Sequence, residues 1–284
     1  MKLKILEEHQ KLIDRAPFHQ LQIDNANCLN TIEGREICEK CYKSRKFFCY
    51  SCYLPVIDKK YIPQIKLPIK IDIIKHIQEI DGKSTAIHAA IIAPEDVKIY
   101  TYPNFPEFSE TEKAVLIFPS VTALNVKDLF ILKKEQNIET NTKIIKNELP
   151  ITRAVFIDST WHQTKSIYKD HRLQNLPCVI LKSRISQFWR HQKKSPRWYL
   201  ATIEAIHQFL VELHTCAYGK IENYSEVEGM SLISDAKTIV TELDLFQPYN
   251  GQYDNLLYFF KYMYEKIHLI YDHDKLWAYK RPLI

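Results

Sequence analysis

The stretch AVFIDSTWHQTK, residues 154–165, combines a short apolar run with a polar turn. The run ends at Asp158, and two hydroxyl residues and Trp161 follow it. Short apolar runs bounded by polar residues are typical of buried strands. One interpretation of the turn is structural: Asp158 or Ser159 caps a helix that begins near Trp161, which is worth about 1 kcal/mol. The other is a ligand site, because α/β sheets bind ligands at the carboxyl ends of their strands.

Similar apolar runs recur along the chain and alternate with stretches of helical periodicity. This alternation is typical of α/β proteins, in which helices flank a mostly parallel sheet. The sequence therefore predicts an α/β fold. The expected strands are residues 67–76, 96–102, 114–118, 153–157 and 177–182. The expected helices are residues 3–14, 202–219 and about 252–270, while 84–92 fits a helix or an extended segment and 133–150 a polar loop.

Composition excludes several classes of protein. The chain has 284 residues and is 46% hydrophobic, which fits one large domain or one domain with a small appendage. Only 5 glycines are present, which disfavours glycine-rich nucleotide loops. No apolar run approaches the roughly 18 residues of a membrane span, and the charged N-terminus lacks the apolar core of a signal peptide. The net charge of +5 permits a nucleic-acid partner without requiring one.

Two cysteine pairs, CEKC (38–41) and CYSC (49–52), give the spacing C-x2-C-x7-C-x2-C. Four thiolates at such spacing suit tetrahedral zinc, and they leave no coordination position open for catalysis. We therefore expect a structural zinc site in an N-terminal module of residues 1–60, before a main domain of residues 61–284. Chance clustering and redox cysteines are the alternatives, and Cys28 could replace one ligand. The expected ligands are Cys38, Cys41, Cys49 and Cys52.

The tetrapeptide Gly82-Lys83-Ser84-Thr85 matches the end of a phosphate-binding loop. The complete motif needs a second glycine five positions earlier, where this chain has Ile77. An ATPase is therefore rejected. Thr85 and the nearby His88 remain candidates for lining another pocket, and a hydrogen-bonded structural histidine is the alternative for His88.

Residues 182–199, KSRISQFWRHQKKSPRWY, contain six cations, four interleaved aromatic residues and no acid. Cations neutralise phosphates, and exposed aromatic rings stack on unpaired bases. This segment predicts contact with single-stranded or looped RNA. The alternative is a solvated loop whose aromatic side chains fold back into the core. The cations are Lys182, Arg184, Arg190, Lys193, Lys194 and Arg197, and the aromatic residues are Phe188, Trp189, Trp198 and Tyr199.

Taken together, these motifs resemble the DTW-domain family. DSTW (158–161) matches that family's D-x-T-W signature. Four further blocks occur in the family's order: KSTAIHA (83–89), FPS (118–120), RW-x-L-x-TIEA (197–205) and GQYDNLLYFF (251–260). The resemblance extends from about residue 28 to residue 270 and is strongest to the eukaryotic type 1 members.

The resemblance implies a tRNA-uridine aminocarboxypropyltransferase with a knotted, SPOUT-like fold. Such an enzyme moves the 3-amino-3-carboxypropyl group of S-adenosylmethionine to N3 of a uridine, here expected at position 20 of the tRNA D-loop, and releases methylthioadenosine. Three loops near the knot would hold the adenosylmethionine. The resemblance also favours the nucleus over the cytoplasm, and a monomer is plausible. The implied cofactor contacts are Thr85, Ser120, Leu181, Trp198 and Thr202.

Uridine N3 must lose a proton before it attacks carbon, so a carboxylate beside it can act as general base. We expect Asp158 to be that base or to orient N3, with Thr160 in its loop and Trp161 walling in the base or cofactor. An ordinary RNA methyltransferase and a non-enzymatic, zinc-containing RNA-binding module are the competing interpretations. A zinc hydrolase is disfavoured by the four-thiolate spacing. The expected tRNA contacts are Lys83, His88, Arg184, Arg190, Lys193 and Arg197.

Overall fold

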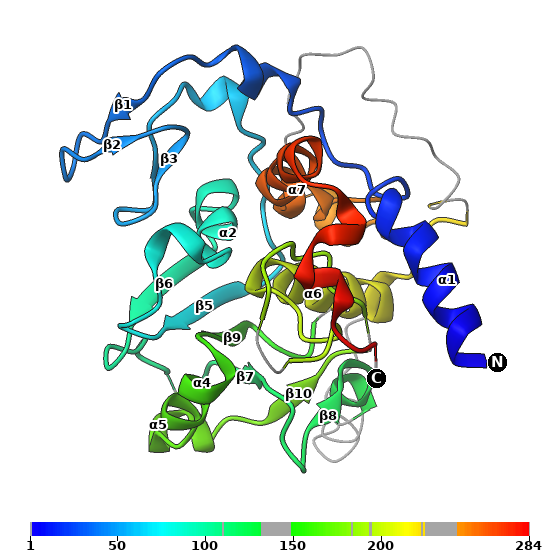
Figure 1. Ribbon diagram of the computed structural model, residues 1–284. Coiled ribbons are helices and arrows are strands. Elements are labelled where there is room, and N and C mark those ends of the chain that lie inside the picture. The colour runs from blue at the N-terminus through cyan, green and yellow to red at the C-terminus, as the bar shows by residue number, and fades with distance from the viewer. Residues whose placement is uncertain are drawn as a thin grey trace.

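The computed structural model describes residues 2–109, 111–131, 149–182, 184–192, 195–222, 224 and 243–283, with the backbone alone at 2–6, 161 and 162. A six-stranded sheet forms its centre, with the strand order β6-β5-β9-β7-β10-β8 (Figure 1). Every neighbouring pair in this sheet is parallel. The strands are β5 (Lys70–Lys75), β6 (Val97–Thr101), β7 (Ala114–Ile117), β8 (Leu124–Asn125), β9 (Arg153–Asp158) and β10 (Cys178–Ile180).

Helices cover both faces of the sheet, which confirms the expected α/β class. The helices are α1 (Lys2–Arg15), α2 (Ala86–Ile92), α4 (Trp161–Tyr168), α5 (His171–Gln174), α6 (Thr202–Tyr218) and α7 (Tyr258–Ile270). No described helix is both long enough and apolar enough to cross a membrane. Short 3-10 turns are η1 (Asn27–Thr31), η2 (Lys59–Tyr61), η3 (Asp81–Lys83), η5 (Leu243–Phe246), η6 (Asp254–Leu257), η7 (His273–Lys275) and η8 (Trp277–Lys280).

Strand β9 is covered on both faces, which explains why apolar residues occupy successive positions in its sequence. Ala154 and Phe156 pack into the larger core with α2, α6 and α7, whereas Val155 packs into a smaller core with α4 and α5. Parallel strands covered on both faces need apolar residues at successive positions. The expected strands are all found, the 84–92 segment is helical, and β8 was not anticipated. Most of the expected loop at 133–150 lies outside the described residues.

Strand β10 enters the sheet between two strands that precede it in the chain. Val179 lies opposite Ile117 of β7 on one side and Leu124 of β8 on the other. The connection 118–123 between β7 and β8 therefore crosses the end of β10, and the Phe118 backbone N–H donates to the Val179 carbonyl (3.0 Å).

Two small hairpins carry the cysteines. One pairs β1 (Glu36–Ile37) with β2 (Ser44–Arg45), and the other pairs β3 (Phe48–Cys49) with β4 (Leu54–Pro55). The residue after each C-x2-C pair, Tyr42 or Tyr53, has a positive φ near 58° and donates its N–H to the first cysteine's carbonyl at 2.8 Å. Both turns thus have the same geometry, which directs their cysteines toward each other.

Candidate functional site

Asp158 ends β9 and joins three segments that are far apart in the sequence. Its side chain is buried, with 5% of the residue exposed. The Ser84 hydroxyl donates to Oδ2 at 2.7 Å, and the Thr202 hydroxyl donates to Oδ1 at 2.6 Å. Ser84 precedes α2, and Thr202 begins α6. One carboxyl group thus links the end of the central strand to the starts of two helices.

Burial raises the pKa of Asp158, because it removes water from the charged form. The hydrogen bonds from Thr202 and Ser84 and the charge of Lys75 act in the opposite direction and do not cancel this effect. A carboxyl group with a raised pKa accepts a proton more readily near neutral pH than an ordinary aspartate does.

The helix after this turn is capped by Thr160, not by Asp158 or Ser159. Thr160 precedes α4, and its backbone N–H donates to Gln163 Oε1 at 3.1 Å, as in a capping box. The prediction that Asp158 or Ser159 caps this helix was therefore wrong. The Asp158 side chain instead bonds to Ser84 and Thr202. The side chain of Trp161 lies outside the described part of the chain. Its contact with the base or cofactor therefore stays a prediction.

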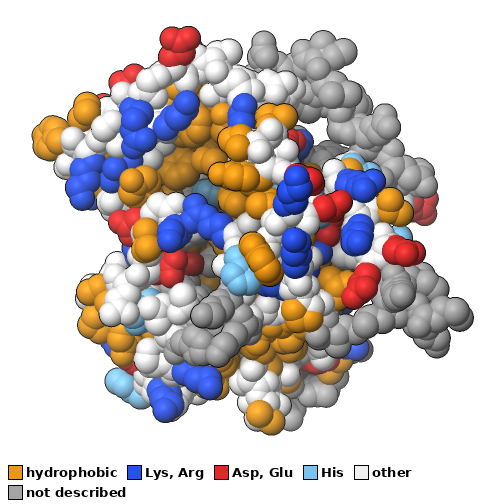
Figure 2. Space-filling model, in the orientation of Figure 1, with side chains coloured by type: hydrophobic (Ala, Val, Ile, Leu, Met, Phe, Trp, Pro, Cys, Tyr) orange, Lys and Arg blue, Asp and Glu red, His pale blue; other side chains and the backbone are white. Residues whose placement is uncertain are grey.

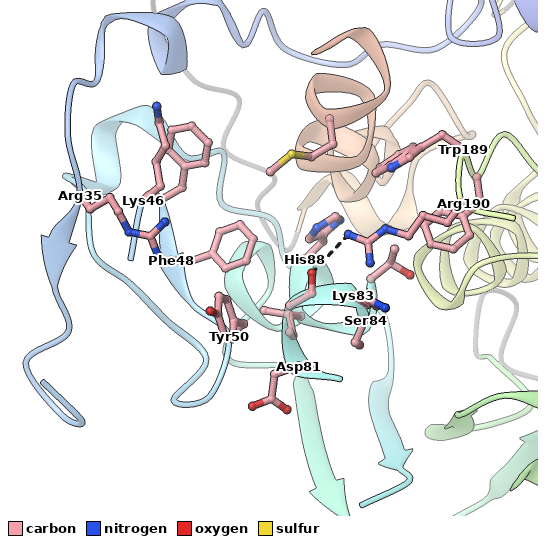
Figure 3. A pocket seen from close by; sticks show the side chains of 16 residues that line it. Arg35, Lys46, Phe48, Tyr50, Asp81, Lys83, Ser84, His88, Trp189 and Arg190 are labelled. Carbon is pink, nitrogen blue, oxygen red and sulfur yellow. Dashed lines mark hydrogen bonds between the residues drawn. The ribbon is translucent and has the colours of Figure 1, made fainter. Parts of the chain in front are cut away.

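A cavity of about 190 Å³ lies against Ser84. Its wall comes from four places: the cysteine hairpins, η3 with the start of α2, the segment 188–190, and Met263 of α7. Figure 2 shows the apolar hollow with lysine and arginine side chains around it, and Figure 3 shows the side chains that line it. Its basic side chains are Arg35, Lys46, Lys83 and Arg190, its rings include Phe48, Tyr50 and Trp189, and its single acid is Asp81.

The expected cofactor contacts fall on loops at one edge of the sheet. Thr85 accepts the backbone N–H of Ile203 at 3.2 Å and so fixes α2 against the start of α6, next to Thr202. Ser120 lies in the connection after β7, and Leu181 directly follows β10. Because β7, β9 and β10 are parallel, their carboxyl ends share the edge where Asp158 lies. Trp198 is 44% exposed and packs edge-on against Tyr199 at 4.5 Å.

The expected tRNA contacts divide into two groups. Lys83, His88 and Arg190 line the cavity. Arg184 instead bonds to His207 Nδ1 at 3.2 Å. Arg197 is 2% exposed. Lys193 lies outside the described residues.

The geometry of Arg197 is that of a structural ion pair. Its guanidinium donates to both carboxylate oxygens of Asp14 in α1, at 2.6 and 2.9 Å. Both side chains are almost completely buried. Such a cation is not available to a phosphate, so we leave Arg197 out of the RNA surface proposed below.

The aromatic side chains of the 182–199 segment do not all face outward, as base stacking would need. Phe188 is 8% exposed and stacks on Phe260 at 6.2 Å. Trp189 also packs on Phe260, at 5.1 Å, although it lines the cavity as well. The alternative, in which the aromatic residues fold back into the core, therefore holds for these two.

The sequence analysis predicted no cavity residue in the cysteine region, yet Arg35, Lys46, Phe47, Phe48 and Tyr50 all line the cavity. The only signal was the basic character of the cysteine region, which had no evident link to residues 83–88. The link is tertiary: Tyr50 and Gly82 line the same cavity, and Ser51 donates to Asp81 at 3.1 Å.

The four expected ligands come together. The Sγ atoms of Cys38, Cys41, Cys49 and Cys52 all lie within 4.8 Å of one another, and Cys41 and Cys49 are 3.5 Å apart. Tetrahedral zinc with Zn–S bonds of about 2.3 Å needs S–S distances of roughly 3.8 Å. All four cysteines are free of disulfides. The cluster can therefore hold a metal ion through four sulfur ligands.

Fold and site together define an α/β protein with a cavity linked through Ser84 to a buried carboxyl group, and with a metal-compatible cysteine module. The sequence model of the DTW domain matches residues 46–268. This chain belongs to the DTW-domain family.

Named relatives match over most of the chain. The human protein named tRNA-uridine aminocarboxypropyltransferase 1 is 42% identical over 265 residues, covering 82% of this chain and 77% of that protein. The Xenopus laevis protein of the same name is 38% identical over 279 residues, covering 88% and 87%. The mouse protein of that name is 38% identical over 262 residues, covering 82% and 77%. No solved structure matches.

Proposed function

We propose that this protein transfers the 3-amino-3-carboxypropyl group of S-adenosylmethionine to N3 of a tRNA uridine. The names of its relatives support this activity. The observation in the structure that supports it most is Asp158, a buried carboxyl group with a raised pKa between the cavity wall and the start of α6. Adenosylmethionine is a substrate here, and Thr85, Ser120, Leu181, Trp198 and Thr202 are the residues proposed to bind it.

The chemistry needs one base and one leaving group. Asp158 accepts the proton of uridine N3, and the N3 electron pair attacks the methylene carbon bonded to the sulfonium. The bond between that carbon and sulfur breaks, its electrons go to sulfur, and methylthioadenosine leaves as a neutral thioether. The protein's part is to align N3 with the carbon, to take the proton and to exclude water.

A knotted, SPOUT-like chain path is part of this proposal. The position of β10 between β7 and β8 supports it, because the chain after β10 passes the connection 118–123. Three loops would then surround the adenosylmethionine: the one after β7, the one after β9 and the one after β10. Their shared position at the edge of the sheet favours a single bound ligand over separate sites.

The cysteine cluster is proposed to hold structural zinc, because four thiolates complete a tetrahedron and leave no position for a reacting group. The residue span 1–60 for this module and a monomeric state are expectations from the sequence, while position 20 of the D-loop and the nuclear location are expectations from the family resemblance. They do not affect the chemistry above.

The deciding experiment is nucleoside mass analysis. Purified protein is incubated with adenosylmethionine and unmodified tRNA, and the RNA is then digested to nucleosides. The expected product is a uridine carrying the aminocarboxypropyl group, absent with Asp158→Ala protein. A methylated nucleoside instead would establish an RNA methyltransferase. No change in mass, with tRNA binding intact and no adenosylmethionine binding, would establish a binding module.

A further inference from the structure

Two buried polar atoms, in residues that line the cavity, have no hydrogen-bond partner among the described residues: His88 Nδ1 and Arg190 Nη1. They belong to residues that Figure 3 shows side by side. A buried polar atom without a partner costs roughly 1–3 kcal/mol, so a pair of them in one cavity suggests a ligand that satisfies both.

His88 is held rigidly and is uncharged. Its residue is 6% exposed, and its ring packs against Phe48 at 5.8 Å and Phe259 at 5.9 Å. Burial lowers the pKa of His88 to about 3, and the nearby charge of Arg190 acts in the same direction. A neutral imidazole that carries its proton on Nδ1 offers a donor there without bringing a second charge into the cavity.

Arg190 supplies the charge. Its Nη2 donates to the Gly82 carbonyl at 3.4 Å, which directs the guanidinium across the cavity and leaves Nη1 for another acceptor. Ser84 lies in the same wall, with its hydroxyl bonded to Asp158. The cavity wall therefore offers two donors, from His88 and Arg190, and the Ser84 hydroxyl, which is hydrogen-bonded to the Asp158 carboxyl group.

We infer, on the basis of the proposed function, that this cavity holds the uracil ring of the acceptor uridine. His88 Nδ1–H and Arg190 Nη1–H donate to its two carbonyl oxygens, and N3–H faces Ser84. When N3 loses its proton to the Ser84 oxygen, the Ser84 proton passes to Asp158 Oδ2. The negative charge of the resulting anion spreads over N3 and both carbonyl oxygens, where the two donors stabilise it.

The size and lining of the cavity fit one nucleobase. Its volume of about 190 Å³ is below the roughly 300–1,000 Å³ of pockets for drug-sized ligands, which favours a single base over a whole adenosylmethionine. Phe48, Tyr50 and Trp189 offer ring surfaces for a base that has left its stack. Arg35 and Lys46, from the cysteine hairpins, are in reach of the phosphates on either side of that base.

The test compares two RNAs and two histidine variants. His88→Phe keeps the aromatic packing and removes the donor, while His268→Phe is the matched control. His268 also has an unpartnered ring nitrogen, Nε2, but does not line the cavity. The RNAs are one tRNA transcribed with ordinary uridine or with 5-fluorouridine, whose N3 is more acidic and needs less stabilisation as an anion.

We expect His88→Phe to lower kcat/KM about 100-fold on the uridine tRNA, as removal of one anion-stabilising donor does. The loss should be clearly smaller on the 5-fluorouridine tRNA, and His268→Phe should match the unaltered protein on both. Circular dichroism and a thermal melt show whether each variant is folded. Arg190→Met should show the same dependence on the RNA, which guards against a folding defect of one variant.

Three other outcomes would contradict either the proposed function or the uracil site. If the unaltered protein forms no aminocarboxypropyl uridine on either RNA, the proposed function itself fails. If it does and His88→Phe equals His268→Phe, the cavity is not the uracil site. Equal losses of folded His88→Phe on both RNAs would show that His88 serves packing alone, which overturns the donor role.

Discussion

At the scale of single residues, the buried carboxyl of Asp158 is stabilised by hydroxyl groups and not by a directly paired cation. Each oxygen accepts one hydroxyl hydrogen bond. Lys75, the residue opposite in β5, forms its ion pair with Asp81. Burial raises the pKa of this carboxyl group, and the hydroxyl hydrogen bonds lower it only in part. The native state therefore binds this proton more tightly than the unfolded chain does.

This raised pKa makes Asp158 a cost to stability at neutral pH. The protonated Asp158 carboxyl group favours the folded state. This contribution to stability is complete below the unfolded pKa of about 3.9 and is lost as pH rises through the higher pKa of the folded state. We therefore expect Asp158→Asn to be at least as stable as the unaltered protein at pH 7 and to form no product. Urea denaturation and nucleoside mass analysis measure the two effects. A strongly destabilised Asn variant would contradict the argument about the buried charge.

A second residue-scale prediction concerns Arg197 and Asp14. Removing one partner of a buried ion pair leaves a charge uncompensated and typically costs about 3–5 kcal/mol. We expect Arg197→Met to lose that much in the free energy of unfolding, measured with urea. The double variant with Asp14→Leu should recover most of the loss, because both charges are then gone.

The same double variant tests whether Arg197 contacts RNA. Since the Arg197 side chain is only 3% exposed, tRNA binding of the folded double variant should be unchanged. A filter-binding assay measures this. Weaker tRNA binding by a fully folded double variant would restore the phosphate contact expected from the sequence.

At the scale of elements, the cysteine hairpins act on the cavity through η3. Arg45 of β2 bonds to Ser51 at 3.3 Å, and Ser51 bonds to Asp81 at 3.1 Å. Asp81 is also the partner of Lys75 in β5. The hairpins therefore support the segment that leads into Ser84, and they add Arg35 and Lys46 to the rim.

Loss of the metal should therefore remove activity before it removes the fold. We expect Cys49→Ser protein to contain no zinc and to form little product, while circular dichroism still shows the helices around the sheet. Elemental analysis should find one zinc per unaltered chain. Cys216→Ser is the control, because Cys216 is exposed on α6 and away from the cluster. Full activity of metal-free Cys49→Ser would contradict the supporting role.

At the scale of the whole molecule, positive charge gathers where three distant parts of the chain meet. Four basic side chains and one acid line the cavity, and they come from residues 35–46, 83 and 190. Figure 2 shows lysine and arginine side chains around the apolar hollow. The excess of +5 over the whole chain is small, so its local concentration is what favours an RNA surface.

This arrangement predicts how tRNA binding depends on salt. Each phosphate contact contributes about 0.7–0.9 to the slope of log affinity against log salt concentration. Arg35→Gln and Lys46→Gln should each weaken binding and reduce the slope by about that amount. Lys98→Gln, on the exposed side of β6, should change neither. Unchanged slopes in the first two variants would exclude phosphate contacts at the rim.

The sequence by itself determined what depends on local pattern. The uninterrupted apolar run before Asp158 required a strand buried on both faces, and the cysteine spacing required two equivalent turns. The ordered motif blocks identified the family before any contact was known. Each of these rests on residues close together in the chain, where periodicity and turn geometry have direct physical consequences.

Only the tertiary structure decided how the site is assembled. Ser84 lies 74 positions before Asp158 and Thr202 lies 44 positions after it, yet both hydroxyls bond the same carboxyl group. Likewise, no local pattern distinguishes the buried Arg197 from the cavity-lining Arg190, since both belong to one basic segment. Contacts between distant segments depend on how helices and hairpins pack on the sheet, and that packing is a property of the whole core.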